Sequence, residues 1–157
     1  MKILLYGINY SPELTGIGKY SGEMGAWLAA HGHDVRAVTA FPYYPEWKLA
    51  PGAKGPFYRR ESLAGVSVTR CPLYVPARPN AWRRIVHLLS FAMSSFPALL
   101  LQWRWRPDVL VLVAPTLFCV PGAWLLSRLT DARLVLHVQD YEVDAMFGLK
   151  MGQSKGV

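Results

Sequence analysis

The sequence predicts an α/β fold, a Rossmann-like doubly wound domain whose parallel sheet is covered by helices on both faces. First, apolar runs rich in β-branched residues alternate along the chain with segments of helical periodicity. Second, these runs are mostly continuous in their hydrophobicity, as expected of strands that are buried on both faces. Third, a chain of 157 residues, 52% of them hydrophobic, is long enough to bury one core of this kind.

The elements begin with a buried strand at residues 2–8. A loop at residues 9–18 follows it and leads into a helix at about residues 19–30, which we expect Gly32 to end as a C-cap. The next apolar run, residues 34–41, is the second predicted strand. Strand, helix and strand in this order predict a parallel pair with a crossover helix.

The middle of the chain predicts a long surface loop at residues 42–56, which are rich in Pro and Gly. A third strand is expected at residues 65–75, where apolar and polar residues alternate. An apolar helix follows at residues 85–103.

The last third of the chain predicts a fourth strand at residues 107–115, a helix at 117–129 and a fifth strand at 132–140. Ligands of such sheets bind beyond the carboxyl ends of the strands. The glycine-containing loop after the first strand and the segments after the fourth and fifth strands should therefore meet at one edge.

Four glycines lie close together at the start of the first helix. Gly16 and Gly18 would let a phosphate or a sugar approach the helix N-terminus, where backbone N–H groups and the helix dipole favour an anion. Gly22 and Gly25, inside the helix, favour close packing instead. A dinucleotide site is disfavoured, because Gly22 comes one residue too late for G-x-G-x-x-G and no acid ends the second strand.

The segment after the fifth strand carries a group of polar side chains: His137, Asp140, Tyr141, Glu142 and Asp144. Asp140 at the end of this strand could orient a hydroxyl or accept its proton, or it could cap the following turn. The four histidines show no metal-ligand spacing, and no nucleophilic serine motif is present.

The basic charge of the chain is concentrated between residues 59 and 106, which hold eight arginines and one acidic residue. This stretch contains the apolar helix, whose ends carry arginines and tryptophans and whose sides show a polar stripe of His87, Ser90 and Ser94. Two interpretations stay open: a buried crossover helix with charged ends, or a helix at a bilayer interface. Nucleic-acid binding is disfavoured because the apolar helix interrupts the basic stretch.

Two cysteines, Cys71 and Cys119, lie in apolar contexts and predict buried free thiols in a reducing compartment. The N-terminus lacks the apolar length and cleavage pattern of a signal peptide. A cytoplasmic location is therefore expected.

Three segments, residues 1–45, 107–118 and 134–149, resemble the N-terminal domain of family-4 glycosyltransferases, in particular the exopolysaccharide type. The resemblance covers essentially the whole chain. It implies a retaining, nucleotide-sugar-dependent, hexosyl-type transferase of the GT-B fold, in which two Rossmann-like domains face each other across a cleft. The N-terminal domain of such enzymes mostly receives the acceptor, and the C-terminal domain holds the donor.

The resemblance also implies roles for individual residues. The loop that reaches the donor phosphates matches Thr15, Gly16 and Gly18, and Asp140 matches the candidate catalytic base near the reacting sugar. Further acceptor-side residues would be His137, Tyr141 and Glu142. The implied partners are a nucleotide-sugar, as donor substrate, and a glycan linked to a lipid diphosphate, with no cofactor and no metal.

Because such acceptors lie in a membrane, the resemblance favours peripheral contact with an anionic inner leaflet. The residues expected at that surface are Arg83, Arg84, Trp103, Arg104, Trp105 and Arg106. Residues 1–157 are expected to be a truncated N-terminal domain that lacks the donor-binding domain and is inactive alone. The alternatives are a stand-alone nucleotide-binding Rossmann domain, such as an oxidoreductase, and a membrane-surface interaction module.

Overall fold

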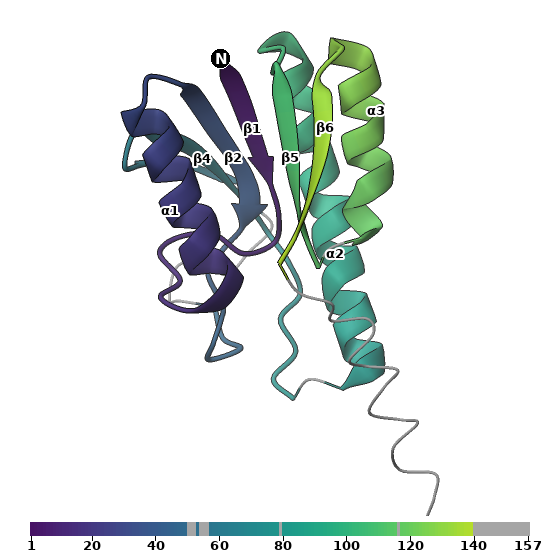
Figure 1. The fold of residues 1–157 in the computed structure, drawn as a ribbon. Helices are drawn as coiled ribbons and strands as arrows, with labels where there is room; N and C mark the ends of the chain where they lie inside the picture. Colours follow the sequence, from purple (N-terminus) through teal and green to yellow (C-terminus); the bar gives the residue numbers. More distant parts are fainter. Residues whose placement is uncertain (50–52, 54–56, 79, 116, 140–157) are drawn as a thin grey trace, which may run out of the picture.

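The computed structural model describes residues 1–49, 53, 57–78, 80–115 and 117–139. Six strands form one sheet in the order β3-β4-β2-β1-β5-β6, with helices on both faces (Figure 1). All neighbouring strands pair in parallel except β3 and β4, which form an antiparallel hairpin at one edge. The predicted fold class, a Rossmann-like α/β sheet flanked by helices, is confirmed.

The five predicted strands are present, each within one to four residues of its expected ends. The strands are β1 (Lys2–Tyr6), β2 (Asp34–Ala40), β3 (Arg59–Leu63), β4 (Val66–Cys71), β5 (Val109–Ala114) and β6 (Arg133–Val138). β3 was not predicted, because its sequence RRESL is polar and charged. Charged side chains are common on edge strands, where they prevent pairing with other chains.

Within the part of the chain that the structure describes, three α-helices and two short 3₁₀ segments accompany these strands. They are α1 (Gly16–Ala30), α2 (Ala81–Leu100), η1 (Leu101–Arg104), η2 (Leu117–Cys119) and α3 (Val120–Thr130). Gly32 follows α1 with φ of +81°, the left-handed conformation expected after a helix end. α2 begins four residues earlier than expected because the Asn80 side chain caps it, accepting a hydrogen bond from the Arg83 amide at 2.8 Å.

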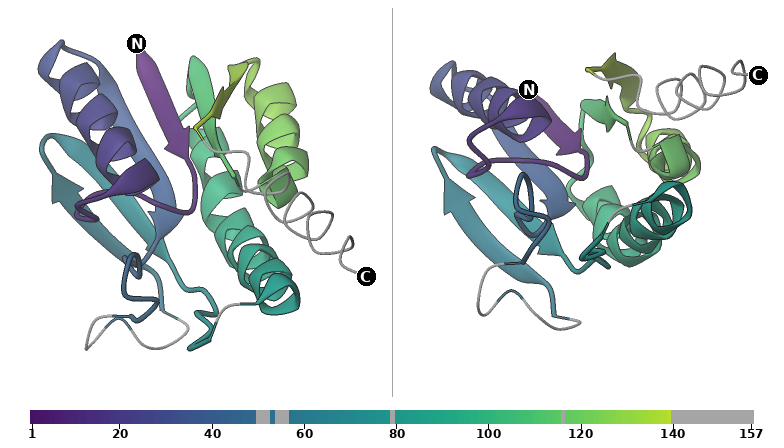
Figure 2. Two further views of the ribbon diagram at one scale, coloured as in Figure 1. Left: turned by 60° about the horizontal axis from the view of Figure 1, so that its bottom comes forward. Right: turned by 90° about the horizontal axis from the view of Figure 1, so that it is seen from below.

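The sheet has a core on each face. Leu4 and Tyr6 of β1 point toward the core with α2 and α3, while Ile3 and Leu5 point toward the core under α1. Figure 2 shows α1 on one side of the sheet and the α2–α3 pair on the other. The continuous hydrophobicity of β1 therefore reflects burial on both faces, as predicted.

The carboxyl ends of the five parallel strands lie at one edge of the sheet, at the bottom of Figure 1. All three α-helices begin at this edge, because each follows a strand and runs back against it. The candidate site lies here, as expected for an open α/β sheet.

Candidate functional site

A small hollow opens at the carboxyl edge. Its walls come from the end of β1, the first turn of α1, the loop after β2, the N-terminal half of α2 and the end of β5. The lining residues are Ile8, Asn9, Gly16, Ile17, Tyr43, Tyr44, Arg84, Leu88 and Pro115. Gly16 and Pro115 thus meet at one edge, as the order of strands and helices predicted.

The first turn of α1 lines this hollow with Gly16 and Ile17. Gly16 has φ of +59°, a left-handed conformation that glycine adopts without strain. Thr15, an exposed residue, makes no side-chain cap hydrogen bond within the described part of the chain. The first amides of the helix therefore remain available to an anion.

The other glycines of α1 have a packing role. A Cβ atom added at Gly18 would lie 2.6 Å from Cβ of Glu13, and one added at Gly22 would lie 2.5 Å from Cβ of Ser11. Both residues are buried under the loop that follows β1. The packing interpretation is confirmed for Gly22, while a phosphate contact of Gly18 stays a prediction.

Glu13 joins the two loops that line the hollow. Its carboxylate is 5% exposed, and Oε1 accepts hydrogen bonds from the Tyr43 and Tyr44 amides at 3.2 and 3.1 Å. Oε2 accepts another from Nδ2 of Asn9 at 2.9 Å. Burial raises the pKa of Glu13 above its ordinary value, and these hydrogen bonds oppose that shift. Glu13 was not among the predicted site residues, although an acid in an otherwise uncharged loop was a usable signal.

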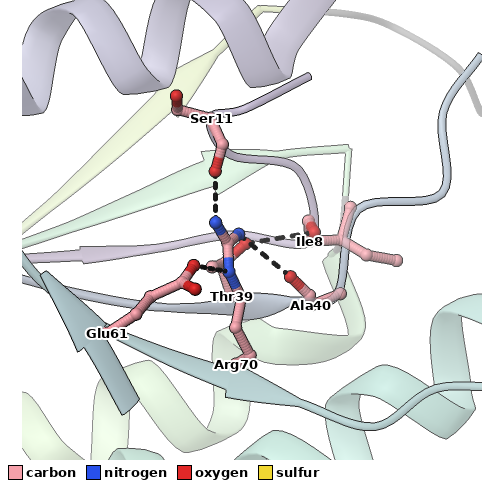
Figure 3. Close-up of polar contacts among 6 residues, drawn as sticks. All are labelled: Ile8, Ser11, Thr39, Ala40, Glu61 and Arg70. Atoms are coloured by element: carbon pink, nitrogen blue, oxygen red, sulfur yellow. Dashed lines mark hydrogen bonds and ion pairs between the residues drawn. The ribbon is translucent and has the colours of Figure 1, made fainter. Parts of the chain in front are cut away.

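Arg70 anchors the loop after β1 from beneath (Figure 3). This residue of β4 is 1% exposed; its Nε donates to Oε1 of Glu61 at 2.7 Å and its Nη1 to the Ala40 carbonyl at 3.2 Å. Its Nη2 donates to the Ser11 carbonyl, and nearby Thr39 donates to the Ile8 carbonyl at 3.2 Å. Arg70 was counted only as one arginine of the basic stretch at residues 59–106, and the structure places it in the interior.

The loop after β2 is fixed to α2 by an aromatic cluster. His87 is fully buried, with ring centroids 4.7 Å from Tyr43 and 5.4 Å from Trp47. Its Nδ1–H donates a hydrogen bond to the Tyr74 carbonyl at 2.5 Å, so the neutral ring carries its proton on Nδ1. Burial lowers the pKa of His87. Arg84, one turn earlier on α2, places its guanidinium 4.8 Å from the Trp47 ring centroid.

Arg84 was predicted at a membrane surface, but the structure places it in the wall of the hollow. It brings a cation to the same cavity as the N-terminus of α1, whose first residue is Gly16. Two positive features thus converge on one hollow with the polar side chain of Asn9 and the ring of Tyr44. Such an arrangement can bind a phosphate or diphosphate next to a sugar.

Other predicted site residues lie elsewhere. His137 is half-buried on β6, opposite Val113 in register, and does not line the hollow. Asp140, Tyr141 and Glu142 fall outside the described residues. Within the described ranges, no group of three or more His, Cys, Asp or Glu side chains is placed to hold a metal ion. Cys71 and Cys119 are buried free thiols, as predicted.

α2 turns its polar stripe inward and much of its apolar surface outward. His87 and Ser95 are fully buried, while Ser90 and Ser94 form hydrogen bonds with the backbone of residues 72–74. Large apolar side chains of α2, η2 and α3 instead form an exposed surface, which we call the outer apolar face. It comprises Trp82, Val86, Leu89, Met93, Phe96, Phe118, Val120 and Trp124.

α2 and η1 together, Ala81–Arg104, are long and apolar enough to cross a membrane by length and composition, and 39% of the apolar window is buried. Of the predicted membrane-surface residues, Arg83, Trp103, Arg104 and Arg106 are exposed. Trp105 is 9% exposed, with its Nε1 donating to Oδ2 of Asp34 at 3.0 Å and the Arg36 guanidinium 4.4 Å from its ring centroid. Trp105 is therefore an interior residue, which corrects its assignment.

Residues 15–155 match the sequence model of a family described as "Glycosyl transferase 4-like domain". The chain is also 60% identical over 157 residues to a protein of Escherichia coli (strain K12) named "Putative colanic acid biosynthesis glycosyl transferase WcaI". The match covers 99% of this chain and 38% of that relative, so the chain spans less than half of the relative's length.

Proposed function

This chain belongs to the glycosyl transferase 4-like family, and we propose that it supplies the N-terminal, acceptor-side half of a retaining GT-B glycosyltransferase that uses a nucleotide-sugar. The observation that carries this proposal is the hollow at the carboxyl edge. There the N-terminus of α1, the Arg84 guanidinium and the Tyr43–Tyr44 segment line one cavity.

The hollow has the chemistry that a glycosyl transfer needs where an acceptor phosphate beside Arg84 meets the donor phosphates at the N-terminus of α1. A helix N-terminus and a guanidinium stabilise phosphate oxygens by charge-assisted hydrogen bonds. Tyrosine rings and an amide side chain offer apolar contact and hydrogen bonds to sugar hydroxyls. Because Arg84 also stacks on Trp47, its guanidinium is held in place before a ligand binds.

The name of the relative refers to colanic acid biosynthesis, which supports a role in exopolysaccharide synthesis. We propose a hexosyl transfer to a glycan carried on a lipid diphosphate, in exopolysaccharide synthesis. Asp140 is the proposed base, with His137, Tyr141 and Glu142 on the acceptor side and Thr15, Gly16 and Gly18 near the donor phosphates. The 157 residues alone should transfer no sugar, because the nucleotide contacts of such enzymes belong to the C-terminal half.

A hybrid protein tests this function. The matching segment of the E. coli relative is replaced by this chain, and colanic acid is measured in a strain whose synthesis depends on that relative. We expect the hybrid to restore synthesis. Arg84→Ala should lower transfer by about ten- to a hundredfold, because a charge-assisted hydrogen bond of about 1.5–3 kcal/mol is lost.

Arg60→Ala is the control, since Arg60 is exposed on the edge strand β3 and lines neither the hollow nor the proposed membrane surface. It should leave transfer within about twofold of the unsubstituted hybrid, a difference of about 0.4 kcal/mol. A folded hybrid that makes no colanic acid would contradict the proposed function. Equal losses in both variants would remove the hollow as its site.

We also propose that the domain works at the inner face of the cytoplasmic membrane. The outer apolar face supports this, because soluble proteins rarely expose a continuous group of large apolar side chains. Exposed arginines at both ends of the α2–η1 segment, including Arg83 and Arg104, suit anionic headgroups. The domain would then lie on the bilayer, with α2 parallel to its surface.

Vesicle flotation tests the membrane contact. The chain should float with vesicles that contain anionic lipid. Met93→Glu or Trp124→Glu should abolish flotation, because each places a charge where an exposed apolar side chain would enter the leaflet. Met93 is 76% exposed and Trp124 is 58% exposed. Trp27→Glu is the control: Trp27 is 59% exposed on α1, which covers the other face of the sheet. If all three variants float equally, the outer apolar face does not bind the membrane.

A further inference from the structure

An apolar groove runs between α2 and the η2–α3 segment, within the outer apolar face. Its lining residues are Tyr6, Leu89, Ala92, Met93, Phe96, Phe118, Cys119, Pro121 and Gly122. The two polar atoms among their side chains are neutral: the Tyr6 hydroxyl is hydrogen-bonded to Oγ of Ser95 at 2.7 Å, and Cys119 is a buried thiol. The groove therefore suits a hydrocarbon and offers no ionic group to a polar ligand.

The groove remains open because neighbouring side chains do not close over it. Met93, Phe96 and Phe118 at its rim are 76%, 38% and 44% exposed. Gly122 contributes no side chain where α3 meets α2, and an added Cβ would lie 3.1 Å from Cδ2 of Phe96. Two helices thus approach closely while a strip of apolar surface stays in water, which is unfavourable unless a ligand covers it.

The groove adjoins the hollow at the carboxyl edge through the same two segments. Leu88 of α2 lines the hollow, and Ala92, one turn later on the same side of α2, lines the groove. Likewise Pro115, just after β5, lines the hollow, and Phe118 lines the groove. Along α2, the apolar groove therefore begins within one turn of the hollow that holds Arg84 and the N-terminus of α1.

We propose that the groove binds the hydrocarbon chain of a phosphorylated lipid whose phosphate or diphosphate lies in the hollow beside Arg84. Charge and hydrophobicity are arranged in the order of such an amphiphile: a cation for the head, then apolar walls for the tail. The groove opens on the outer apolar face, so the rest of the chain can continue into the leaflet. This inference rests on the proposed function, because it places the head of the lipid in the acceptor hollow.

Binding of soluble diphosphates to the purified 157-residue chain tests the groove. Farnesyl diphosphate, kept below its aggregation concentration, is compared with inorganic diphosphate by calorimetry. Burying two methylene groups would already raise affinity by about tenfold. We therefore expect farnesyl diphosphate to bind at least tenfold more tightly than inorganic diphosphate.

Two variants address the groove in different ways. Ala92→Phe fills it, and Met93→Ser removes part of its exposed rim with little effect on packing. Both should remove the advantage of the farnesyl chain and leave binding of inorganic diphosphate unchanged. Ala30→Phe, at an exposed position of α1, is the control and should keep the advantage.

The outcomes separate this inference from the proposed function. Equal affinities for the two diphosphates, or an advantage that survives in both groove variants, would overturn the groove as the lipid site. If Arg84→Ala still lowered the affinity for both diphosphates in that case, the hollow would remain the proposed anion site. Absence of binding by either diphosphate would overturn the anion site of the hollow and, with it, this assignment of the lipid.

Discussion

Replacing Arg70 with alanine should lower the free energy of unfolding by about 3 kcal/mol. The guanidinium is 1% exposed and links β4 to the Glu61 carboxylate and to the carbonyls of Ala40 and Ser11. Its removal leaves buried acceptors without a donor and a cavity beneath the loop after β1. The loss should therefore affect both global stability and the position of that loop.

Arg60→Ala is the matched control for this experiment. Arg60 lies on β3 opposite Thr69 of β4, next to the residue pair that contains Arg70, but its side chain is exposed. Its substitution should change stability by no more than about 0.5 kcal/mol. Urea unfolding followed by circular dichroism compares the two variants. Equal midpoints for both would show that the Arg70 contacts contribute little.

Glu13→Ala is expected to cost about 2–3 kcal/mol of stability and to weaken diphosphate binding at the hollow. The carboxylate accepts three hydrogen bonds from Asn9, Tyr43 and Tyr44, and these contacts hold two loops together. Without them the donors lose their partners, and the loop after β2 is free to move away from α1. A site whose walls must first be ordered binds its ligand less tightly.

Glu46→Ala provides the comparison, because Glu46 is an exposed carboxylate of the loop after β2, which Glu13 contacts. It should leave both stability and diphosphate affinity nearly unchanged. Glu13→Gln keeps one acceptor oxygen and should give values between those of Glu13→Ala and the unsubstituted chain. A Glu13→Ala protein that binds diphosphate as tightly as the Glu46→Ala protein would rule out the role of Glu13 in holding the hollow.

Together, the contacts of Arg70, Glu13 and His87 indicate that the hollow is preformed. Arg70 fixes the loop after β1, and Glu13 joins that loop to the loop after β2. His87 of α2 packs against the loop after β2. The conformational entropy of these loops is therefore lost mostly when the chain folds, so ligand binding does not have to order them.

The local pattern of the sequence was enough to predict five strands, the glycine at the N-terminus of α1 and the edge at which a site would form. Apolar runs identify buried strands without knowledge of their neighbours, and the topology of parallel sheets brings their carboxyl ends together. The short polar strand β3 escaped prediction because its pairing with β4, and not its own composition, makes it a strand.

Only the tertiary structure decided where the charged and polar residues lie. Arginines from one basic stretch have three different positions: Arg70 is buried, Arg84 lines the hollow, and Arg104 is exposed. Helical periodicity likewise showed that α2 has a polar stripe, but not that this stripe faces inward. Its partners are backbone groups of residues 72–74, which come from another segment of the chain. Periodicity defines the faces of a helix, whereas the burial of each face depends on neighbours that only the folded chain supplies.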